Sequence, residues 1–213
     1  MFYLGLDPSL TSFGVVLIDG NTENSSIVQS IILKTTPIKS IEERIVKLSN
    51  NVFDIISKVG EPSKNLRIAI EGLSFGSRGQ AFAELGALHY FLRILFMDNK
   101  LKYQIVPPTK LKKFVCGTGR AKKDLMLLNA YKKFKVSFES SDICDAYCLA
   151  RMLKEYPIIT EFGKPKPKSK EKSEEKLQTK TNSTPKKTTP KPKKSTTPKH
   201  KITKKVKSNG NKK

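Results

Sequence analysis

The sequence has no run of about 20 apolar residues, the length that a membrane-spanning helix requires, so we expect no membrane contact. It also has no charged segment ahead of an apolar one at its N-terminus, so we expect no signal peptide. Cysteine is scarce: the three residues, Cys116, Cys144 and Cys148, form no even disulfide framework. These absences predict an intracellular protein in a reducing compartment.

Acidic residues are few, 19 against 41 basic ones, which gives a formal net charge of +22. Residues 161–213 hold 19 lysines, four glutamates and no arginine, so they carry +15 of that excess. They consist largely of Lys, Pro, Ser and Thr, with too little apolar surface to form a core. We therefore predict a globular domain over residues 1–160 and a disordered tail over residues 161–213. The tail would attract phosphate backbones without reading sequence, although solubility or localisation is an alternative role.

Residues 1–160 contain short apolar runs followed by turn residues, which predict strands, and longer segments with helical apolar spacing. The expected strands are Phe2–Leu6, Phe13–Ile18, Ile27–Leu33, Leu66–Ile70 and Tyr103–Val106. The expected helices run from Ile41 to Val59 after a Ser40 cap, over Gln80–Met97, and over about 122–134 and 142–156. Three antiparallel strands followed by alternating helices and strands predict an α/β fold, a mixed five-stranded sheet flanked by helices.

Four acidic residues fall where a strand ends or a helix begins. Asp7 ends the first strand and Glu71 the fourth, and Asp142 and Asp145 lie three apart at the start of the last helix. If strands one and four are parallel neighbours, these carboxylates meet at one edge of the sheet. Carboxylates without His or Cys suit Mg²⁺ or Mn²⁺ rather than zinc, and two such ions can promote phosphodiester hydrolysis.

Structural interpretations compete with this one. Taken singly, Asp7 before a proline is a common turn residue, and Asp142 would favour a helix N-terminus in any protein. Glu71 is harder to explain in this way because it ends an apolar strand. Cys144 and Cys148 stand four residues apart, a spacing able to hold a metal, but buried core thiols are the better interpretation.

A basic stretch surrounds Gly117 and Gly119, whose backbone can approach phosphates closely. We interpret it as a DNA contact, with a solvated face as the alternative. Its basic residues are Lys110, Lys112, Lys113, Arg120, Lys122 and Lys123.

Taken together, these motifs resemble one known family, the RuvC-type Holliday junction resolvases, which have the RNase H-like fold. The similarity covers roughly residues 1–155, including Pro107–Asp124. It rests on Gly5-Leu6-Asp7-Pro8-Ser9, Gly14, Ile70-Glu71, Asp142-Ile143-Cys144-Asp145-Ala146 and Leu149-Ala150.

The resemblance implies a crossover junction endodeoxyribonuclease that cuts four-way DNA junctions in recombination, repair or replication, leaving 5′-phosphate and 3′-hydroxyl ends. It implies Mg²⁺ as cofactor, with Mn²⁺ as a substitute, two ions to each site. It assigns metal binding and catalysis to four acids and adds two catalytic lysines. These residues are Asp7, Glu71, Asp142, Asp145, Lys112 and Lys123.

A four-way junction has two-fold symmetry, so we also expect a homodimer. The apolar helix Gln80–Met97, with Phe91 and Phe96 beyond its main stripe, is the candidate interface, and core packing explains the same residues nearly as well.

The sequence departs from the family pattern in two places. The position three after Glu71, where the family has an aromatic residue that stacks on a junction base, is Ser74, and Phe75 follows it. Phe75 is thus expected to contact DNA one residue later, or to pack in the core. The second departure is the lysine tail, and together they suggest a viral or phage member acting inside a host cell. Arg78, in a Ser-Arg-Gly segment, is expected either to contact DNA from a mobile loop or to mark a helix entry.

Two other functions are compatible with the sequence. One is a less selective RNase H-like nuclease on flaps, forks or RNA–DNA hybrids. The other is a non-enzymatic binder or an actin-like ATPase, which needs a second glycine-rich phosphate loop, and Gly117-Thr118-Gly119 is the only candidate.

Overall fold

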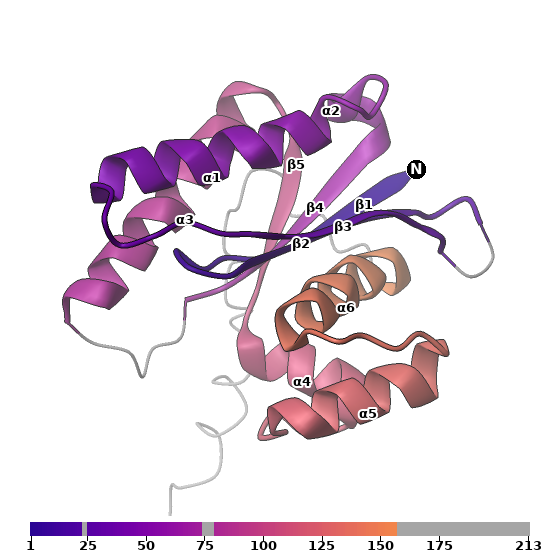
Figure 1. The fold of residues 1–213 in the computed structure, drawn as a ribbon. Helices are drawn as coiled ribbons and strands as arrows, with labels where there is room; N and C mark the ends of the chain where they lie inside the picture. Colours follow the sequence, from indigo (N-terminus) through magenta and orange to yellow (C-terminus); the bar gives the residue numbers. More distant parts are fainter. Residues whose placement is uncertain (23–24, 74–78, 157–213) are drawn as a thin grey trace, which may run out of the picture. The chain divides into compact units, whose positions relative to one another are not determined.

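The computed structural model describes residues 1–22, 25–73 and 79–156. They form a five-stranded sheet with the order β3-β2-β1-β4-β5 (Figure 1). The strands are β1 (Phe2–Asp7), β2 (Phe13–Asp19), β3 (Ile27–Leu33), β4 (Leu66–Glu71) and β5 (Lys102–Val106). The first three pair antiparallel, whereas β4 pairs parallel with both β1 and β5. The predicted mixed sheet is confirmed, and β1 and β4 are neighbours.

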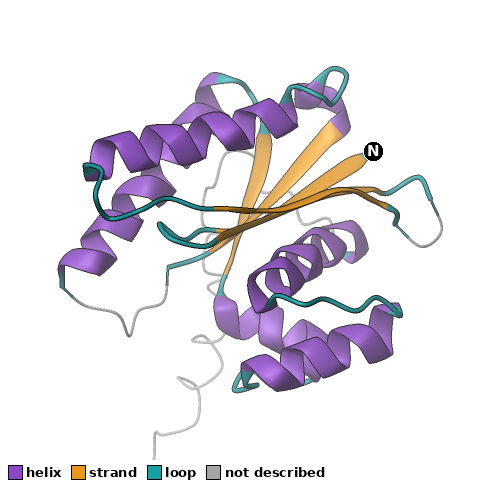
Figure 2. Ribbon diagram, in the orientation of Figure 1, coloured by secondary structure: helices purple, strands orange, loops and turns teal. Residues whose placement is uncertain are grey.

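Helices cover both faces of the sheet (Figure 2). The helices of the described residues are α1 (Ile41–Ile56), α2 (Pro62–Asn65), α3 (Gln80–Asp98), α4 (Pro108–Cys116), α5 (Lys123–Phe134) and α6 (Ser141–Glu155). One face carries α1 and α3, and the opposite face carries α4, α5 and α6. None of these helices is both long and apolar enough to cross a membrane.

Four of the strands, β1, β2, β4 and β5, contribute side chains to two separate cores, one on each face of the sheet. In β1, Leu4 and Leu6 pack with α1 and α3, whereas in β2, Val16 and Ile18 pack with α6 on the other face. Because both faces are covered, a central strand such as β2 is buried along almost its whole length. This explains why the strands appear in the sequence as continuous apolar runs rather than as alternating patterns.

The helix α6 lies directly against the backbone of β1 and β2. A Cβ atom on Gly5 would lie 1.8 Å from the carbonyl oxygen of Ala146, and one on Gly14 would lie 2.2 Å from that of Asp142. Both distances are far below van der Waals contact, so the two glycines permit this approach. Gly14 is also the antiparallel partner of Asp7, so the first turn of α6 is held above the end of β1.

Two helices, α2 and α4, are not predicted by the sequence patterns. Each begins with a proline, Pro62 in α2 and Pro108 in α4. In the sequence, Pro108 is interpreted only as the end of the preceding strand. Proline favours the first helical position because its missing N–H has no partner there. The spacing of Leu111 and Val115, the buried residues of α4, is the sequence signal for this helix. The predicted capping box of Ser40 is confirmed.

The interface interpretation of Phe96 is wrong, and its alternative, core packing, is confirmed. Phe96 is completely buried, and its ring stacks with Phe53 and lies tilted against Tyr103 in the core, so it is unavailable to a partner. Its position on α3 one turn after Leu92, which is also buried, is the physical reason. By contrast, Phe91 is 37% exposed and remains a candidate contact.

Several predictions concern residues outside the described ranges. They are the disordered tail over residues 161–213 and the DNA contacts of Phe75 and Arg78.

Candidate active site

Two of the four acids come from neighbouring parallel strands. Leu6 pairs with Ile70, so Asp7 and Glu71 follow side by side at the same edge of the sheet. After burial and the charge of Glu71, a hydrogen bond between the two carboxyl groups raises the pKa of Asp7, and it lowers the pKa of Glu71. Such a bond requires a proton, because two ionised carboxylates have no hydrogen to donate.

The other two acids come from the first turns of α6. Ser140 caps this helix, and its hydroxyl oxygen accepts a hydrogen bond of 3.2 Å from the backbone N–H of Asp142. Because Asp142 and Asp145 are three residues apart, they occupy the same side of the helix. The charge of Asp142 contributes to the raised pKa of Asp7, and the charge of Asp7 contributes to the raised pKa of Asp145. The four acids therefore form one electrostatic cluster.

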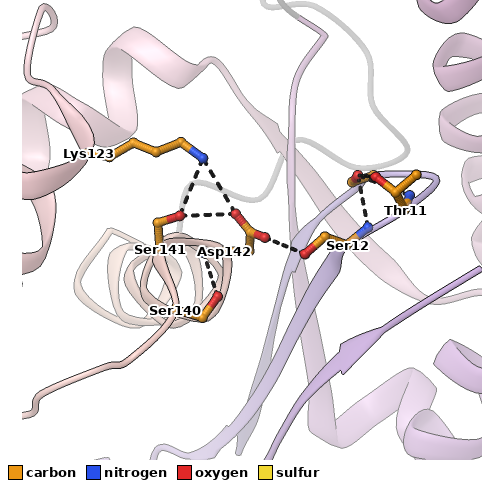
Figure 3. A network of polar contacts seen from close by, with 7 residues as sticks. Thr11, Ser12, Lys123, Ser140, Ser141 and Asp142 are labelled. Atoms are coloured by element: carbon orange, nitrogen blue, oxygen red, sulfur yellow. Dashed lines mark hydrogen bonds and ion pairs between the residues drawn. The ribbon is translucent and has the colours of Figure 1, made fainter.

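Asp142 has more polar partners than the other acids (Figure 3). Its Oδ2 accepts a hydrogen bond of 2.5 Å from the Ser12 hydroxyl, and its Oδ1 accepts one of 3.2 Å from Ser141. The Lys123 ammonium lies 3.7 Å from Oδ1 and 3.3 Å from the Ser141 hydroxyl. The charge of Asp142 is therefore compensated within the protein.

The pKa values of the other three acids are raised. The pKa of Asp7 is raised to about 9, first by burial and then by the nearby charge of Glu71. The pKa of Asp145 is raised to about 7, first by burial and then by the charge of Asp7. Burial also raises the pKa of Glu71. Burial and mutual repulsion thus both oppose ionisation of these three acids.

The cluster fits a divalent cation by its chemistry. Its donors are carboxylate oxygens, which hard cations prefer. Asp145 Oδ1 is buried without a hydrogen-bond partner among the described residues, so it lacks the donor that a buried oxygen needs. Within the described part of the chain, the side chains as they are positioned include no group of three Asp, Glu, His or Cys that could hold an ion.

The two predicted catalytic lysines reach this cluster from different helices. Lys123 is the first residue of α5, and its positive charge partly offsets the rise in the pKa values of Asp7, Glu71 and Asp145. Lys112, in α4, lowers the pKa of Glu71 and Asp145. The structure thus places both lysines beside the acids.

The remaining basic residues of the predicted DNA contact belong to α4 and to the segment that follows it. Lys110 and Lys113 line an apolar pocket with Phe114, Met152 and Tyr156. Arg120 and Lys122 are exposed in the segment between α4 and α5. Their contact with DNA stays a prediction.

Sequence reasoning missed Ser12 and His89. His89 of α3 is buried, and its Nε2 lies 3.0 Å from the carbonyl oxygen of Glu71, so it supports the strand end that carries this acid. Burial lowers the pKa of His89, which favours the neutral ring. No local pattern marks either residue. The prediction that Cys144 and Cys148 are buried core thiols is confirmed.

The sheet order, with helices on both faces of the sheet, defines a protein with the RNase H-like fold. The family profile described as "Crossover junction endodeoxyribonuclease RuvC" matches residues 3–152, and the chain belongs to this family. The family consists of divalent metal-dependent nucleases.

Individual relatives agree with this assignment. The crossover junction endodeoxyribonuclease RuvC of Sulfurovum sp. (strain NBC37-1) is 26% identical over 152 residues, which cover 70% of this chain and 92% of the relative. That of Prochlorococcus marinus (strain NATL1A) is 27% identical over 152 residues, which cover 70% of this chain and 96% of the relative.

Solved structures confirm the fold. Thermus thermophilus RuvC superposes with a TM-score of 0.61 at 17% identity, covering 75% of this chain and 99% of that one. T. thermophilus RuvC in complex with Holliday junction substrate gives a TM-score of 0.61 at 18% identity, covering 70% and 90% respectively.

Proposed function

We propose that the protein is a structure-selective endonuclease that resolves four-way DNA junctions by hydrolysing phosphodiester bonds. Its membership in the crossover junction endodeoxyribonuclease family supports this substrate. The observation that carries the proposal is the cluster of Asp7, Glu71, Asp142 and Asp145 at one sheet edge, with Lys123 beside it. A viral or phage origin and an intracellular location stay predictions.

For the cofactor we propose two Mg²⁺ ions in each site, with Mn²⁺ as a substitute, held by the four acids. When bound, such ions activate a water molecule and stabilise the leaving oxygen of a phosphodiester. The raised pKa of Asp7 means that this residue has to give up a proton before it can act as a ligand. The exposed ammonium of Lys123 is free to turn from Asp142 towards a phosphate oxygen, because its side chain is 73% exposed.

For DNA binding we propose the basic residues that accompany Lys112 and Lys123 in α4 and in the segment before α5. Exposed Lys and Arg side chains contact phosphates and position the substrate without reading its sequence. The proposed contacts are Lys110, Lys113, Arg120 and Lys122, together with Phe75 and Arg78 outside the described residues.

We further propose a homodimer that uses α3. This helix leaves four large apolar side chains exposed, Tyr90, Phe91, Ile94 and Met97, although Phe96 and Leu92 of the same helix are buried in the core. Exposed apolar side chains grouped on one helix are typical of a protein–protein interface. A two-fold dimer would bring two active sites to the two symmetric strands of a four-way junction.

The test is cleavage of matched DNA substrates in Mg²⁺. We expect a mobile four-way junction to be cut symmetrically and much faster than linear duplex, flaps, forks or RNA–DNA hybrids of the same sequence. The positions of the cuts, mapped on labelled strands, would show the symmetry. Equal rates on all substrates would replace the junction proposal by the less selective nuclease.

Deletion of residues 161–213 provides a separate prediction, because it removes 19 lysines but none of the four acids. We expect the shortened protein to fold and to keep its metal-dependent cleavage. Its affinity for linear duplex should fall, and the slope of log affinity against log salt should flatten by about 0.9 for each phosphate that the protein no longer neutralises. Binding to junction and duplex across a salt series measures both effects.

Preference for junctions over duplex should stay the same or rise in this deletion, because a polycation attracts every DNA shape alike. An unchanged salt slope would assign the tail to solubility or to a protein partner. A reduced junction preference would mean that the tail itself contributes to selectivity.

A further inference from the structure

The segment that follows β1 reaches across to the active-site helix. At its end, the Ser12 hydroxyl donates a hydrogen bond of 2.5 Å to Oδ2 of Asp142 (Figure 3). The two residues are 130 positions apart in the sequence, so the bond joins the connection between β1 and β2 to the first turn of α6. It is a neutral donor on a carboxylate, and it leaves the charge of Asp142 in place.

The two oxygens of Asp142 thus face different surroundings. Oδ2 is bonded to Ser12, whereas Oδ1 lies 3.2 Å from the Ser141 hydroxyl and 3.7 Å from the Lys123 ammonium. Figure 3 shows Ser12 and Lys123 on opposite sides of the carboxylate. A hydroxyl fixed on one oxygen restricts rotation of the carboxylate and keeps the other oxygen towards the cationic side of the site.

Ser12 is itself held in place from two directions. The Ser9 hydroxyl oxygen accepts hydrogen bonds from the backbone N–H groups of Thr11, at 3.3 Å, and Ser12, at 3.2 Å. These bonds fix the turn from within.

The second anchor comes from α1, through a buried charge. Arg44, 8% exposed, donates through Nη2 to the carbonyl oxygen of Leu10 at 3.0 Å and through Nε to the Thr35 hydroxyl at 2.9 Å. The Thr35 hydroxyl donates in turn to the same Leu10 carbonyl oxygen. A buried arginine used in this way indicates a segment whose position matters, because its burial is costly unless it is paired.

We propose that Ser12 is a positioning residue that orients Asp142 for cation binding. This inference rests on the proposed function only in taking Asp142 as a metal ligand. Removal of a group that hydrogen-bonds to a metal ligand typically lowers metal affinity or activity by about 10- to 100-fold. A bond that served only to hold the fold together would instead change thermal stability and leave metal affinity unaltered.

The test uses the full chain and Mn²⁺ alone, with binding measured by calorimetry in the absence of DNA. We expect Ser12→Ala to weaken Mn²⁺ binding by about 10- to 100-fold. The Mg²⁺ concentration for half-maximal junction cleavage should rise by a similar factor, with little change in melting temperature in EDTA. Ser12→Thr, which keeps the hydroxyl, should restore most of the affinity.

Thr11→Ala is the matched control. Thr11 is exposed, and its hydroxyl contacts Ser9 at 3.4 Å rather than any acid, so this variant should bind Mn²⁺ like the wild type. In an Asp142→Ala background, Ser12→Ala should have no further effect on Mn²⁺ affinity, because there is no carboxylate left to orient.

Unchanged Mn²⁺ affinity in Ser12→Ala, or an equal loss in the Asp142→Ala background, would overturn the inference. A wild-type chain that binds Mn²⁺ with this Ser12 dependence but does not cut junctions would overturn the proposed function alone. A wild-type chain that binds no Mn²⁺ would overturn both.

Discussion

Asp7→Asn is expected to reduce cleavage by several orders of magnitude while binding to a four-way junction is retained or becomes tighter. The substitution keeps the shape of the side chain but removes the charge that would hold a cation. It also prevents Asp7 from losing a proton and adding a negative charge to a buried cluster that would then repel the phosphate backbone. Cleavage and binding are measured separately, with cleavage rates in Mg²⁺ and binding in EDTA or Ca²⁺.

The same substitution should change stability in a pH-dependent manner. The native metal-free protein keeps a proton on Asp7 up to a pKa of about 9, whereas the unfolded chain loses it near the ordinary value of 3.8. Between these values the native state binds more protons, so the stability of the wild type falls as pH rises. Asp7→Asn removes this pH-dependent loss of stability, because the asparagine side chain does not titrate. Its melting temperature in EDTA should therefore exceed that of the wild type at pH 8, with a smaller difference at pH 5.

Asp54→Asn is the control for both measurements, because Asp54 is an exposed acid in α1. It should affect neither cleavage nor the pH dependence of melting. Normal Mg²⁺-dependent cutting by Asp7→Asn would remove Asp7 from the catalytic set.

Lys123→Ala should slow cleavage by roughly tenfold to a thousandfold, more than it weakens junction binding. The Lys123 ammonium lies 3.7 Å from Asp142, and its side chain is largely exposed. It is therefore placed to donate to a phosphate oxygen on which negative charge develops during cleavage. Single-turnover rates at saturating enzyme separate this effect from affinity.

Lys122→Ala removes the same charge one residue earlier, where the side chain is exposed. We expect this variant to bind more weakly and to cut at the wild-type rate once saturated. If Lys123→Ala behaves in the same way, Lys123 serves as a phosphate anchor and takes no part in the chemistry.

The parts of the site that could be predicted from sequence depend on local patterns. Apolar runs that end at Asp7 and Glu71 indicate strands, and the parallel pairing of β1 with β4 then brings both acids to one edge. Asp142 and Asp145 could be placed in the same way, because a spacing of three residues on a helix fixes their common side.

What could not be predicted depends on contacts between distant segments. The partner of Ser12 lies 130 residues away, and the role of His89 depends on the approach of α3 to the end of β4. The raised pKa values of Asp7 and Asp145 result mainly from burial, which only the assembled fold determines. The helix α4 could not be predicted for a different reason. Its first residue is Pro108, and a proline at this position is as typical of the end of a strand as of the start of a helix.

The close contact of α6 with the sheet has a consequence for how this nuclease tolerates change. Asp7 and Glu71 belong to the sheet layer, whereas Asp142 and Asp145 belong to the helical layer, so the distance between the two pairs is set by the interlayer spacing. Gly5 and Gly14 set that spacing at its minimum, since a Cβ atom at either position would meet the α6 backbone within 2.2 Å or less. Substitutions at these two positions, neither of which carries a functional group, would therefore act on catalysis by moving one half of the site as a rigid body relative to the other.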